Sequence, residues 1–282
     1  MYKRQTLLNG TLDQIDDEGK VAINNFGQVA FHGIIEIEGG IFDENIRAVF
    51  KADGQTTQVV AKVGDTLDGA TVEEINQIGG VAISDFDEVA FHGRVVDPDP
   101  VIGGDTLKAV FTTDGLVAQE ASELPDGNKL DDINEDGGVA INLFGDVAFH
   151  GSVIIATAGG DSVRAVLTQE GVIAKEGDNL GGTILDEIEV SGGVAINLFG
   201  DVVFLGRTGN VKALFTQHGL VARVGDNLSD GTTLKDIKAN GGVAVKPYGF
   251  EAAFHGVISV GDQGAGVDAV LVGQAPSGAG AF

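Results

Sequence analysis

The chain has 282 residues, of which 42 are acidic and 17 are basic, so its formal net charge is −25. This charge excludes a nucleic-acid binder that depends on Lys and Arg to neutralise phosphates, and it disfavours docking on anionic membranes. The chain has no Cys, which excludes disulfides, zinc–thiolate sites, iron–sulfur clusters and thiol catalysis. Hydrophobic residues make up 43% of the chain, and Gly is abundant at 44 residues whereas Pro is rare at 5. That composition favours a folded protein with short strands joined by tight turns.

No apolar run approaches the roughly 18 residues of a membrane-spanning helix, so no membrane insertion is expected. The N-terminus, Met1 to Arg4, lacks the apolar region of a secretory signal peptide. On these grounds the chain is either a cytoplasmic protein or a mature fragment of a longer one.

One segment recurs five times, and this repeat determines the fold prediction. The clearest copies are GGVAINLFGDVAFHG at 137–151 and GGVAINLFGDVVFLG at 192–206. The five copies span residues 21–33, 81–93, 139–151, 194–206 and 243–256.

Taken in chain order, each repeat predicts four strands. The first, Val-Ala-Ile, is apolar on both faces and should be buried. An Asn-x-Phe-Gly turn leads to the second strand, Asp-Val-Ala-Phe-His-Gly. The third and fourth strands begin near Arg47 and Val59 in the first repeat. A linker of near-constant length, such as 225–237, follows, and we interpret it as the crossing from the outer strand of one sheet to the inner strand of the next.

Four-stranded antiparallel units repeated radially predict an all-β fold, a five-bladed β-propeller in a single domain over residues 1–282. A stacked solenoid is the alternative, but its units are usually shorter and it needs end caps that this sequence lacks. The repeats span approximately 10–68, 69–126, 127–181, 182–230 and 231–273, with 274–282 as a tail.

The fifth repeat lacks a fourth strand, because the sequence after it is typical of a tail. Residues 1–9 resemble the missing piece when Gly10 is aligned with Gly69. We therefore expect the N-terminal strand to complete the last blade and close the ring, which removes unpaired sheet edges.

The repeats at 24–31 (NNFGQVAF) and 142–149 (NLFGDVAF) resemble the bacterial choice-of-anchor tandem-repeat proteins. Their units read N-x-x-G-x-V-A-F-x-A and continue with A-[LV]-F and V-A-x-x-G-D segments, and the resemblance covers nearly the whole chain. It implies a secreted or surface-displayed bacterial protein, located extracellularly or at the cell surface, and it implies no reaction. This chain departs from the pattern at two positions, since Gly replaces the final Ala and His precedes it in four repeats.

Four histidines occupy that one repeat position, namely His32, His92, His150 and His255, while Leu205 occupies it in the remaining repeat. Four ring-related histidines could share a metal ion. However, second strands should lie on the order of 10 Å from the ring axis, whereas an imidazole nitrogen must come within about 2.1 Å of the ion. We favour structural histidines, and the alternatives are residues that line ligand sites on one face and a shared metal.

Gly-Asp pairs follow the fourth strands at Asp65, Asp178 and Asp226. The oxygen-rich stretch from Asp226 to Asp230 makes these two residues candidates for binding Ca²⁺, although it lacks the EF-hand spacing and the closing Glu. The alternative is an Asp that caps a turn through its own backbone amides. No other cofactor is indicated.

Acidic clusters precede the first strands, as at Asp131, Asp132, Glu135 and Asp136. We expect neighbouring blades to present these clusters side by side, so that they repel one another and the fold is stabilised by salt and by acidification toward pH 5. The competing outcome is that regularly placed basic residues pair with these acids. Those basic residues include Lys62, Lys108, Arg164, Lys175, Lys212 and Arg223.

Two classes of function remain. The first is a non-catalytic, monomeric extracellular binding or scaffold module, whose repeated sites hold a carbohydrate or another surface polymer. The alternative is a glycan hydrolase or lyase that uses His and carboxylates at the propeller channel mouth. A catalytic site occurs once, so its residues should depart from the repeat sequence. The strongest departures, at 84–87, 97–100 and 246–250, contain no recognisable combination of catalytic residues. We therefore favour the binding module, and its candidate ligand-binding residues are His32, His92, His150 and His255.

Overall fold

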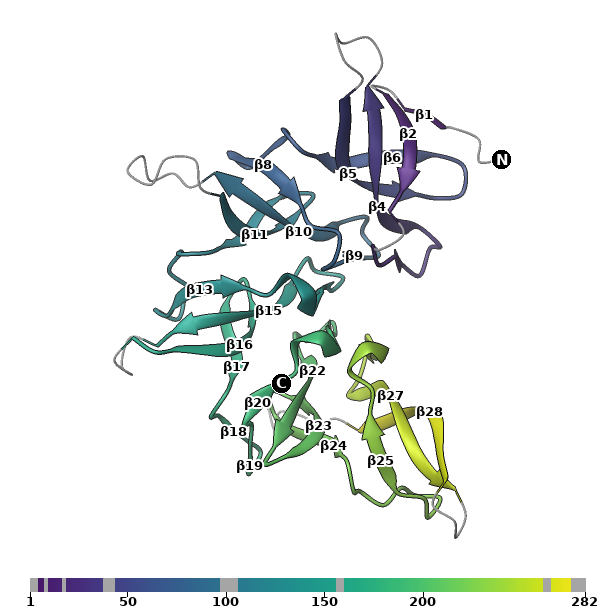
Figure 1. Ribbon diagram of the computed structural model, residues 1–282, viewed down its shortest axis with the longest axis vertical. Coiled ribbons are helices and arrows are strands. Elements are labelled where there is room, and N and C mark those ends of the chain that lie inside the picture. The colour runs from purple at the N-terminus through teal and green to yellow at the C-terminus, as the bar shows by residue number, and fades with distance from the viewer. Residues whose placement is uncertain are drawn as a thin grey trace. The chain divides into compact units, whose positions relative to one another are not determined.

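The computed structural model describes residues 5–7, 10–16, 19–37, 44–96, 106–155, 160–260 and 265–274 (Figure 1). Its regular elements are β-strands and three single-turn 3-10 helices, η1 (Glu135–Gly137), η2 (Val190–Gly192) and η3 (Ala239–Gly241). Every strand pairing in these ranges is antiparallel, which confirms the predicted all-β class. No helix in this part of the chain is long and apolar enough to span a bilayer.

The chain divides into two compact units, and each is described by itself. Unit 1 comprises residues 1–122 and 130–147, and unit 2 comprises residues 123–129 and 148–282. The sequence predicts a single domain in which five sheets surround one axis. Both the single domain and the five-bladed ring stay predictions.

Unit 1 contains two sheets with the strand orders β1-β2-β4-β5-β6 and β7-β8-β10-β11-β12, in which β3 also pairs with β4 and β9 with β10. The first sheet consists of β1 (Gln5–Leu7), β2 (Gly10–Ile15), β3 (Ala22–Ile23), β4 (Val29–Ile37), β5 (Glu44–Ala52) and β6 (Thr57–Lys62). The second consists of β7 (Thr66–Leu67), β8 (Ala70–Ile75), β9 (Val81–Ile83), β10 (Val89–Val96), β11 (Thr106–Thr112) and β12 (Gly115–Gln119). Strands β13 (Lys129–Ile133) and β14 (Val139–Ile141) follow.

Unit 2 repeats the same hairpins. Its strands from the third repeat are β15 (Val147–Ile154), β16 (Ser162–Thr168) and β17 (Gly171–Lys175), followed by the small hairpin β18 (Asn179–Leu180) and β19 (Thr183–Ile184). The next sheet contains β20 (Glu187–Ile188), β21 (Val194–Ile196), β22 (Val202–Thr208), β23 (Val211–Thr216) and β24 (Gly219–Arg223). The last contains β25 (Leu234–Ile237), β26 (Val243–Val245), β27 (Glu251–Val260) and β28 (Ala265–Gln274).

The linker after each fourth strand contributes a strand of its own, so the prediction that it only crosses between four-stranded sheets was wrong. In the second sheet, β9 pairs with Val89–Phe91 of β10, and the linker strand β8 pairs with Gly93–Val95. A three-residue β9 leaves half of that side of β10 without partners, and β8 satisfies those backbone groups. The first, fourth and fifth sheets have the same two-piece arrangement.

The junction between the two pieces falls at the histidine position of the repeat. The backbone oxygen of His92 accepts a hydrogen bond from Asn76 N at 3.0 Å, directly after β8. The equivalent bonds run from Asp16 N to His32 O (3.0 Å), from Glu189 N to Leu205 O (3.0 Å) and from Lys238 N to His255 O (2.9 Å).

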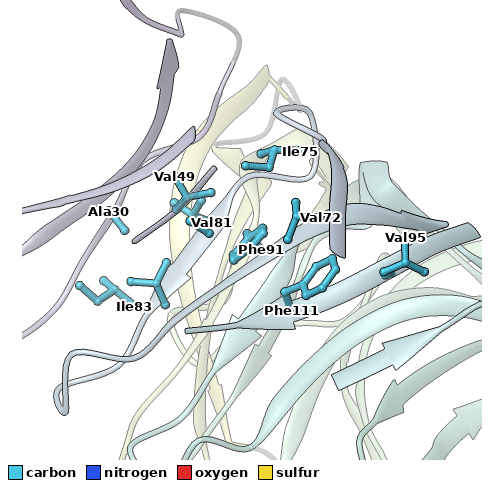
Figure 2. Packing of buried hydrophobic residues seen from close by; sticks show 12 residues of the cluster. Ala30, Val49, Val72, Ile75, Val81, Ile83, Phe91, Val95 and Phe111 are labelled. Carbon is cyan, nitrogen blue, oxygen red and sulfur yellow. The ribbon is translucent and has the colours of Figure 1, made fainter. Parts of the chain in front are cut away.

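The core of unit 1 lies between its two sheets, where Ala30 and Val49 of the first sheet pack with Val81, Phe91 and other residues of the second (Figure 2). Phe91 and Phe111 are opposite each other on β10 and β11, with stacked rings whose centroids are 5.4 Å apart. Such cross-strand aromatic pairs stabilise a sheet in addition to their burial. The same pair occurs as Phe31–Phe50 at 5.3 Å and Phe204–Phe215 at 6.0 Å.

The N-terminal strand forms the same hairpin as its counterpart in the second repeat. Leu7 of β1 stands opposite Gly10 of β2, and Leu67 of β7 stands opposite Ala70 of β8. Gly10 therefore corresponds to Ala70, one residue from the predicted alignment with Gly69.

Strand β28, at the other end of the chain, pairs with β27 and with no other strand among the described residues. It extends to Gln274, the first residue of the predicted tail. Residues 1–4, 8–9 and 275–282 lie outside the described residues, and ring closure by the N-terminal strand stays a prediction.

A glycine in the second strand of the first, second and fourth sheets lies directly under a carbonyl of the linker strand. A Cβ added at Gly93 would lie 2.6 Å from Glu74 O and 3.2 Å from Cε2 of Phe111. At Gly33 and Gly206, the nearest linker carbonyls would lie 2.6 and 2.7 Å from an added Cβ. This close approach explains why Gly stands where the resembling repeats have Ala.

We predict that Gly93→Ala lowers the free energy of unfolding by about 1–3 kcal/mol, because the methyl group must displace backbone and a buried ring. Urea unfolding of the two proteins measures the difference.

Gly249→Ala is the matched control, since a Cβ there meets only Cδ of Lys246 at 3.6 Å. Its stability should stay close to that of the parent protein. Equal losses in both variants would show that the cost at Gly93 comes from the loss of glycine alone and not from crowding.

Candidate functional site

One end of each sheet is formed by the turn at the Asn-x-Phe-Gly position of the repeat, and we call it the turn end. Three turns keep this sequence, whereas the second reads Ser-Asp-Phe-Asp at 84–87 and the fifth reads Lys-Pro-Tyr-Gly at 246–249. In the first turn, Oδ1 of Asn24 accepts hydrogen bonds from the backbone N–H groups of Phe26 and Gln28, both at 3.0 Å. Its Nδ2 donates to Ser84 O in the next turn at 3.0 Å. The asparagine thus closes its own turn and also ties it to the neighbouring turn.

Each of these turns projects an aromatic ring into solvent. The exposed fractions are 75% for Phe26, 71% for Phe86, 70% for Phe144, 61% for Phe199 and 72% for Tyr248. Single exposed apolar residues are ordinary on protein surfaces, but an aromatic ring at one repeat position in five turns is not scattered. The turn end therefore carries a repeated aromatic surface.

A hollow of about 530 Å³ lies between the second and third turns of unit 1, and we call it the Phe86–Phe144 hollow. Its volume lies within the range of small-ligand sites. It is lined by Phe86, Asp87, Glu88, Thr113, Asp114, Leu143 and Phe144.

The hollow is acidic, and one of its carboxyl groups is perturbed. Partial burial is the largest cause that raises the pKa of Glu88, and the negative charges of Asp114 and Asp146 raise it further, against a hydrogen bond with Thr112. Asp87 has a positive φ of 72° where other turns have Gly, and it forms an ion pair with Lys51 at 3.2 Å. A strained residue and crowded carboxyl groups at one hollow are typical of a binding site.

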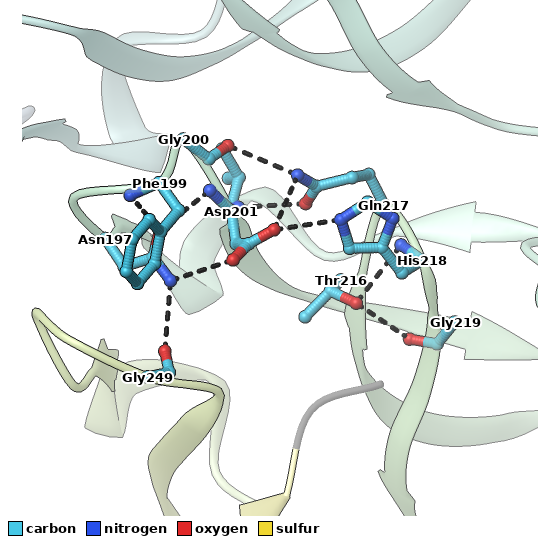
Figure 3. Close-up of polar contacts among 10 residues, drawn as sticks. Asn197, Phe199, Gly200, Asp201, Thr216, Gln217, His218, Gly219 and Gly249 are labelled. Carbon is cyan, nitrogen blue, oxygen red and sulfur yellow. Dashed lines mark hydrogen bonds and ion pairs between the residues drawn. The ribbon is translucent and has the colours of Figure 1, made fainter. Parts of the chain in front are cut away.

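The fourth turn has the same backbone but a different polar set (Figure 3). Oδ1 of Asn197 accepts from the N–H groups of Phe199 at 2.8 Å and Asp201 at 2.9 Å, and its Nδ2 donates to Gly249 O at 3.0 Å. The buried carboxylate of Asp201 lies 2.9 Å from Nε2 of His218. Asp201 therefore has a partner in the hairpin that joins β23 and β24.

The repeated histidines do not lie at this surface. His32, His92 and His150 are 3%, 0% and 0% exposed, so burial weighs against direct contact with an external ligand. Only His255 is partly exposed; it lies 3.4 Å from Asp268 and lines a second hollow of about 210 Å³. Ligand binding by these four residues stays a prediction.

The His92 ring packs against a glycine turn instead. An added Cβ on Gly79 would lie 2.5 Å from Cδ2 of His92, and at Gly241 it would lie 2.3 Å from Cβ of His255. Leu205 takes the same place under Gly192, which shows that the position needs bulk more than an imidazole. The described residues contain no group of three or more His, Asp or Glu side chains placed to hold a metal ion.

Burial lowers the pKa of two of these histidines. For His32 it lowers the pKa to about 4, with the charges of His92 and Arg47 adding to the effect and Asp16 opposing it. For His92 it also lowers the pKa to about 4, with Lys20 and Lys108 adding to it and the Gly138 backbone opposing. Neither ring nitrogen of His32 has a hydrogen-bond partner. Both rings are therefore neutral at physiological pH.

Each of the two calcium candidates caps its own turn, and Ca²⁺ binding by them stays a prediction. Asp226 accepts from Arg223 N at 2.8 Å and forms an ion pair with its Nε at 3.2 Å. Asp230 accepts from the backbone N–H and hydroxyl groups of Thr232 at 2.9 and 2.7 Å, and these bonds lower its pKa. Both residues act as the turn caps of the alternative interpretation.

The regularly placed basic residues pair with the linker acids, as the second charge outcome predicts. Lys62 contacts Asp65 at 2.7 Å through the same turn geometry as Arg223 and Asp226. Lys212 reaches Asp236 at 3.1 Å on the following linker strand. Lys108 reaches Asp132 at 2.5 Å and Arg164 reaches Glu187 at 3.6 Å.

The aromatic surface is the feature that the sequence analysis missed. The Phe of Asn-x-Phe-Gly was treated only as a turn residue, although a large apolar side chain between Asn and Gly in a hairpin turn has no core to enter. That contradiction between residue type and position, repeated five times, was the available signal.

We predict that acid destabilises the fold through its buried histidines. Their folded pKa values lie near 4, below the roughly 6.5 of an unfolded chain, so between these values only the unfolded state binds the protons. Stability is therefore complete above pH 6.5 and falls as pH drops toward 4, by on the order of a few kcal/mol for the pair. Thermal unfolding across this range measures it.

The double variant His32→Leu, His92→Leu should weaken this pH dependence, because Leu205 shows that leucine suits the position. His255→Gln is the control and should keep the parent slope, because its ring is partly exposed and its partner Asp268 is largely exposed. An unchanged slope in the leucine variant would assign acid sensitivity to the carboxylates instead.

Solved structures with a similar chain path share little sequence with this protein. The polysaccharide lyase Uly1 has 9% identity and a TM-score of 0.40 over 90% of this chain and 57% of the lyase, so the chain spans little more than half the lyase's length. The Penicillium chrysogenum α-L-arabinanase complexed with arabinobiose has 12% identity and a TM-score of 0.33 over 90% and 83% of the chains. The luciferin-regenerating enzyme has 8% identity and a TM-score of 0.32 over 96% and 95%. Values this low assign no activity to this chain.

No curated protein matches the sequence. Residues 2–153 match the family of unknown function DUF7453. Because this match covers more than half of the 282 residues, the protein belongs to the DUF7453 family.

Proposed function

We propose that this protein is a non-catalytic binding module that holds a carbohydrate polymer through the repeated aromatic rings of its turn end. The observation that carries the proposal is the exposure of Phe26, Phe86, Phe144, Phe199 and Tyr248 at one repeat position. Aromatic faces pack against the apolar faces of sugar rings, and the neighbouring carboxylates accept hydrogen bonds from hydroxyl groups.

Repetition is the second support. One shallow ring contributes little affinity, but several rings at a fixed spacing engage successive units of a polymer and raise the overall affinity without new contacts. The resemblance to surface-displayed repeat proteins supports an extracellular setting, in which such polymers are available. A monomer suffices, because the repeats already supply several sites.

We further propose that the five repeats form a five-bladed ring closed by the N-terminal strand, which would present all five rings on one face. The full set of five second strands supports this arrangement, as does the edge of β28 that no strand among the described residues pairs with. An unpaired ten-residue edge strand is a hazard for aggregation that ring closure removes.

The chain lacks Cys, which allows a direct test of ring closure. The hairpin register matches Tyr2 to the position of Lys62, which stands opposite Ala48, the equivalent of Ala269. Tyr2→Cys combined with Ala269→Cys should therefore form a disulfide under mild oxidation, because neighbouring strands bring Cα atoms within about 6 Å. Tyr2→Cys with Val211→Cys is the control pair. If the first pair forms no more disulfide than the control pair, ring closure at β28 is ruled out.

For the binding function, we predict that Phe86→Ala with Phe144→Ala weakens binding to the preferred polymer by about tenfold or more, because central aromatic anchors dominate such interfaces. A glycan array with and without calcium identifies that polymer, and calorimetry gives the affinities. The melting temperature should change little, since both rings are exposed.

Val96→Ala removes an exposed apolar side chain at the opposite end of β10 and is the matched control. It should bind like the parent protein. If the array shows no glycan ligand, or if both variants bind equally well, the aromatic turns are not the binding surface.

The raised pKa of Glu88 beside Asp114 favours a second candidate, glycan hydrolysis with Glu88 as the general acid. The histidines of the original enzyme hypothesis have no part in it, because three of them are buried. Product release from the bound polymer that Glu88→Gln abolishes would establish this activity.

A further inference from the structure

The Phe86–Phe144 hollow combines two features that recognise different parts of one ligand. Phe86 and Phe144 are largely exposed and line it together with Leu143, which gives apolar walls. Glu88 and Asp114 supply carboxylates in the same hollow. A ligand that occupies it must therefore offer both an apolar face and groups that match negative charge.

The two carboxylates have no basic side chain within ion-pair distance among the residues that the structure describes. Asp87, the third acid of the lining, is already paired with Lys51. Glu88 also reaches into the third turn, since its Oε2 would lie 2.7 Å from a Cβ added at Gly145. The uncompensated charge is thus held between the aromatic walls.

The fourth sheet shows the same positions with the charge compensated. Asp201 precedes β22 as Glu88 precedes β10, and His218 takes the position of Asp114 in the hairpin between the third and fourth strands. There the acid is partnered by the imidazole at 2.9 Å, and the ring of Phe199 stacks on Phe250 at 6.4 Å. The hollow in unit 1 thus differs from the fourth sheet in having no imidazole beside its carboxylates, whereas the third repeat also has carboxylates, Asp146 and Glu170, at the same two positions.

We propose that the Phe86–Phe144 hollow binds a protonated amino sugar, with the pyranose ring between the two phenyl rings and its ammonium group on Glu88 and Asp114. This inference rests on the proposed polymer-binding function and names the ligand class at one of its sites. A cation that approaches aromatic faces is attracted by their quadrupoles as well as by the carboxylates. The net charge of −25 also attracts cationic polymers and repels anionic ones.

The titration of Glu88 gives a pH dependence that accompanies the geometry. Burial, Asp114 and Asp146 raise its pKa, and an ammonium group beside it favours the ionised form. Binding should therefore lower the pKa of Glu88, and affinity should increase as pH rises through that pKa while the amino sugar stays protonated.

The test compares two hexamers that share a sugar backbone and differ in charge. β-1,4-linked glucosamine hexamer carries ammonium groups, and its fully N-acetylated counterpart is neutral. At about pH 6 and low salt, we expect calorimetry to show the cationic hexamer binding at least about tenfold more tightly, with the preference reduced by added NaCl. Glu88→Gln and Asp114→His, which copies the fourth sheet, should each remove most of that preference.

Glu73→Gln is the matched control, because it removes one exposed carboxylate of the same unit from β8. It should keep the preference for the cationic hexamer. Loss of preference in this control as well would overturn the site, because net charge alone would then explain the binding.

The remaining outcomes also decide the matter. Equal binding of both hexamers would overturn the amino-sugar inference and leave the proposed function intact, whereas binding of neither would contradict both. Hexalysine binding as tightly as the cationic hexamer would overturn the sugar part of the proposal, because it would show recognition of charge alone. Calcium that binds through Glu88 while neither hexamer binds would replace the organic cation with a metal.

Discussion

The second strand of each repeat is hydrogen-bonded on both sides and buried among its neighbours, and the rest of the structure depends on this double pairing. Strand β10 pairs with β11 along one edge, and along the other edge it pairs with β8 and β9 in succession. Two short pieces can meet on one strand only where the chain between them turns away. The histidine and glycine of the repeat lie at this junction, so both are determined by backbone geometry before any ligand is considered.

The same constraint explains why the turn end is free to vary. Packing fixes Gly93 and the Phe91–Phe111 pair, because a change there must move backbone or a buried ring. The turns need only an acceptor at the Asn position and a residue that tolerates positive φ. Ser84 supplies that acceptor in the second turn at 3.2 Å from each donor, and Asp87 replaces Gly. The aromatic residue between these positions is largely exposed in all five turns, which leaves it available for binding.

Much of the scaffold was predictable from the sequence, because a five-fold repeat tests each strand assignment several times. The strand piece in the linker was not, since its residues, such as Leu234–Ile237, are too few to show a period of two. The one-residue error at Gly10 has a similar cause: glycine marked the turn in one copy but a strand residue in the other. An alignment of repeats matches residues of the same type, so it placed Gly10 on Gly69. The hairpin instead fixes which residues stand opposite each other, and by that register Gly10 matches Ala70.

The candidate site was harder to predict than the fold for a physical reason. Histidine has ligand chemistry, so a histidine repeat suggested a site, yet burial lowers its pKa and keeps the ring neutral inside the packing. Phenylalanine has no such chemistry, so its place in the turn was easily taken as incidental. The structure reverses both interpretations, because the histidines are buried and the aromatic turn residues are exposed. The sequence pattern says little about the exposure of a single turn residue.

Symmetry and asymmetry have separate physical origins in this chain, and the difference bears on where function can lie. Interior positions repeat because each sheet must bury the same strand in the same way. Surface charges need not repeat, and the acid that precedes the second strand has an imidazole partner in one sheet and another carboxylate in a second. Leaving like charges close together costs stability unless a ligand or a proton compensates them. A carboxylate pair without a basic partner, set between exposed aromatic rings, therefore distinguishes the Phe86–Phe144 hollow from the fourth sheet and makes it a position where a cationic ligand gains affinity.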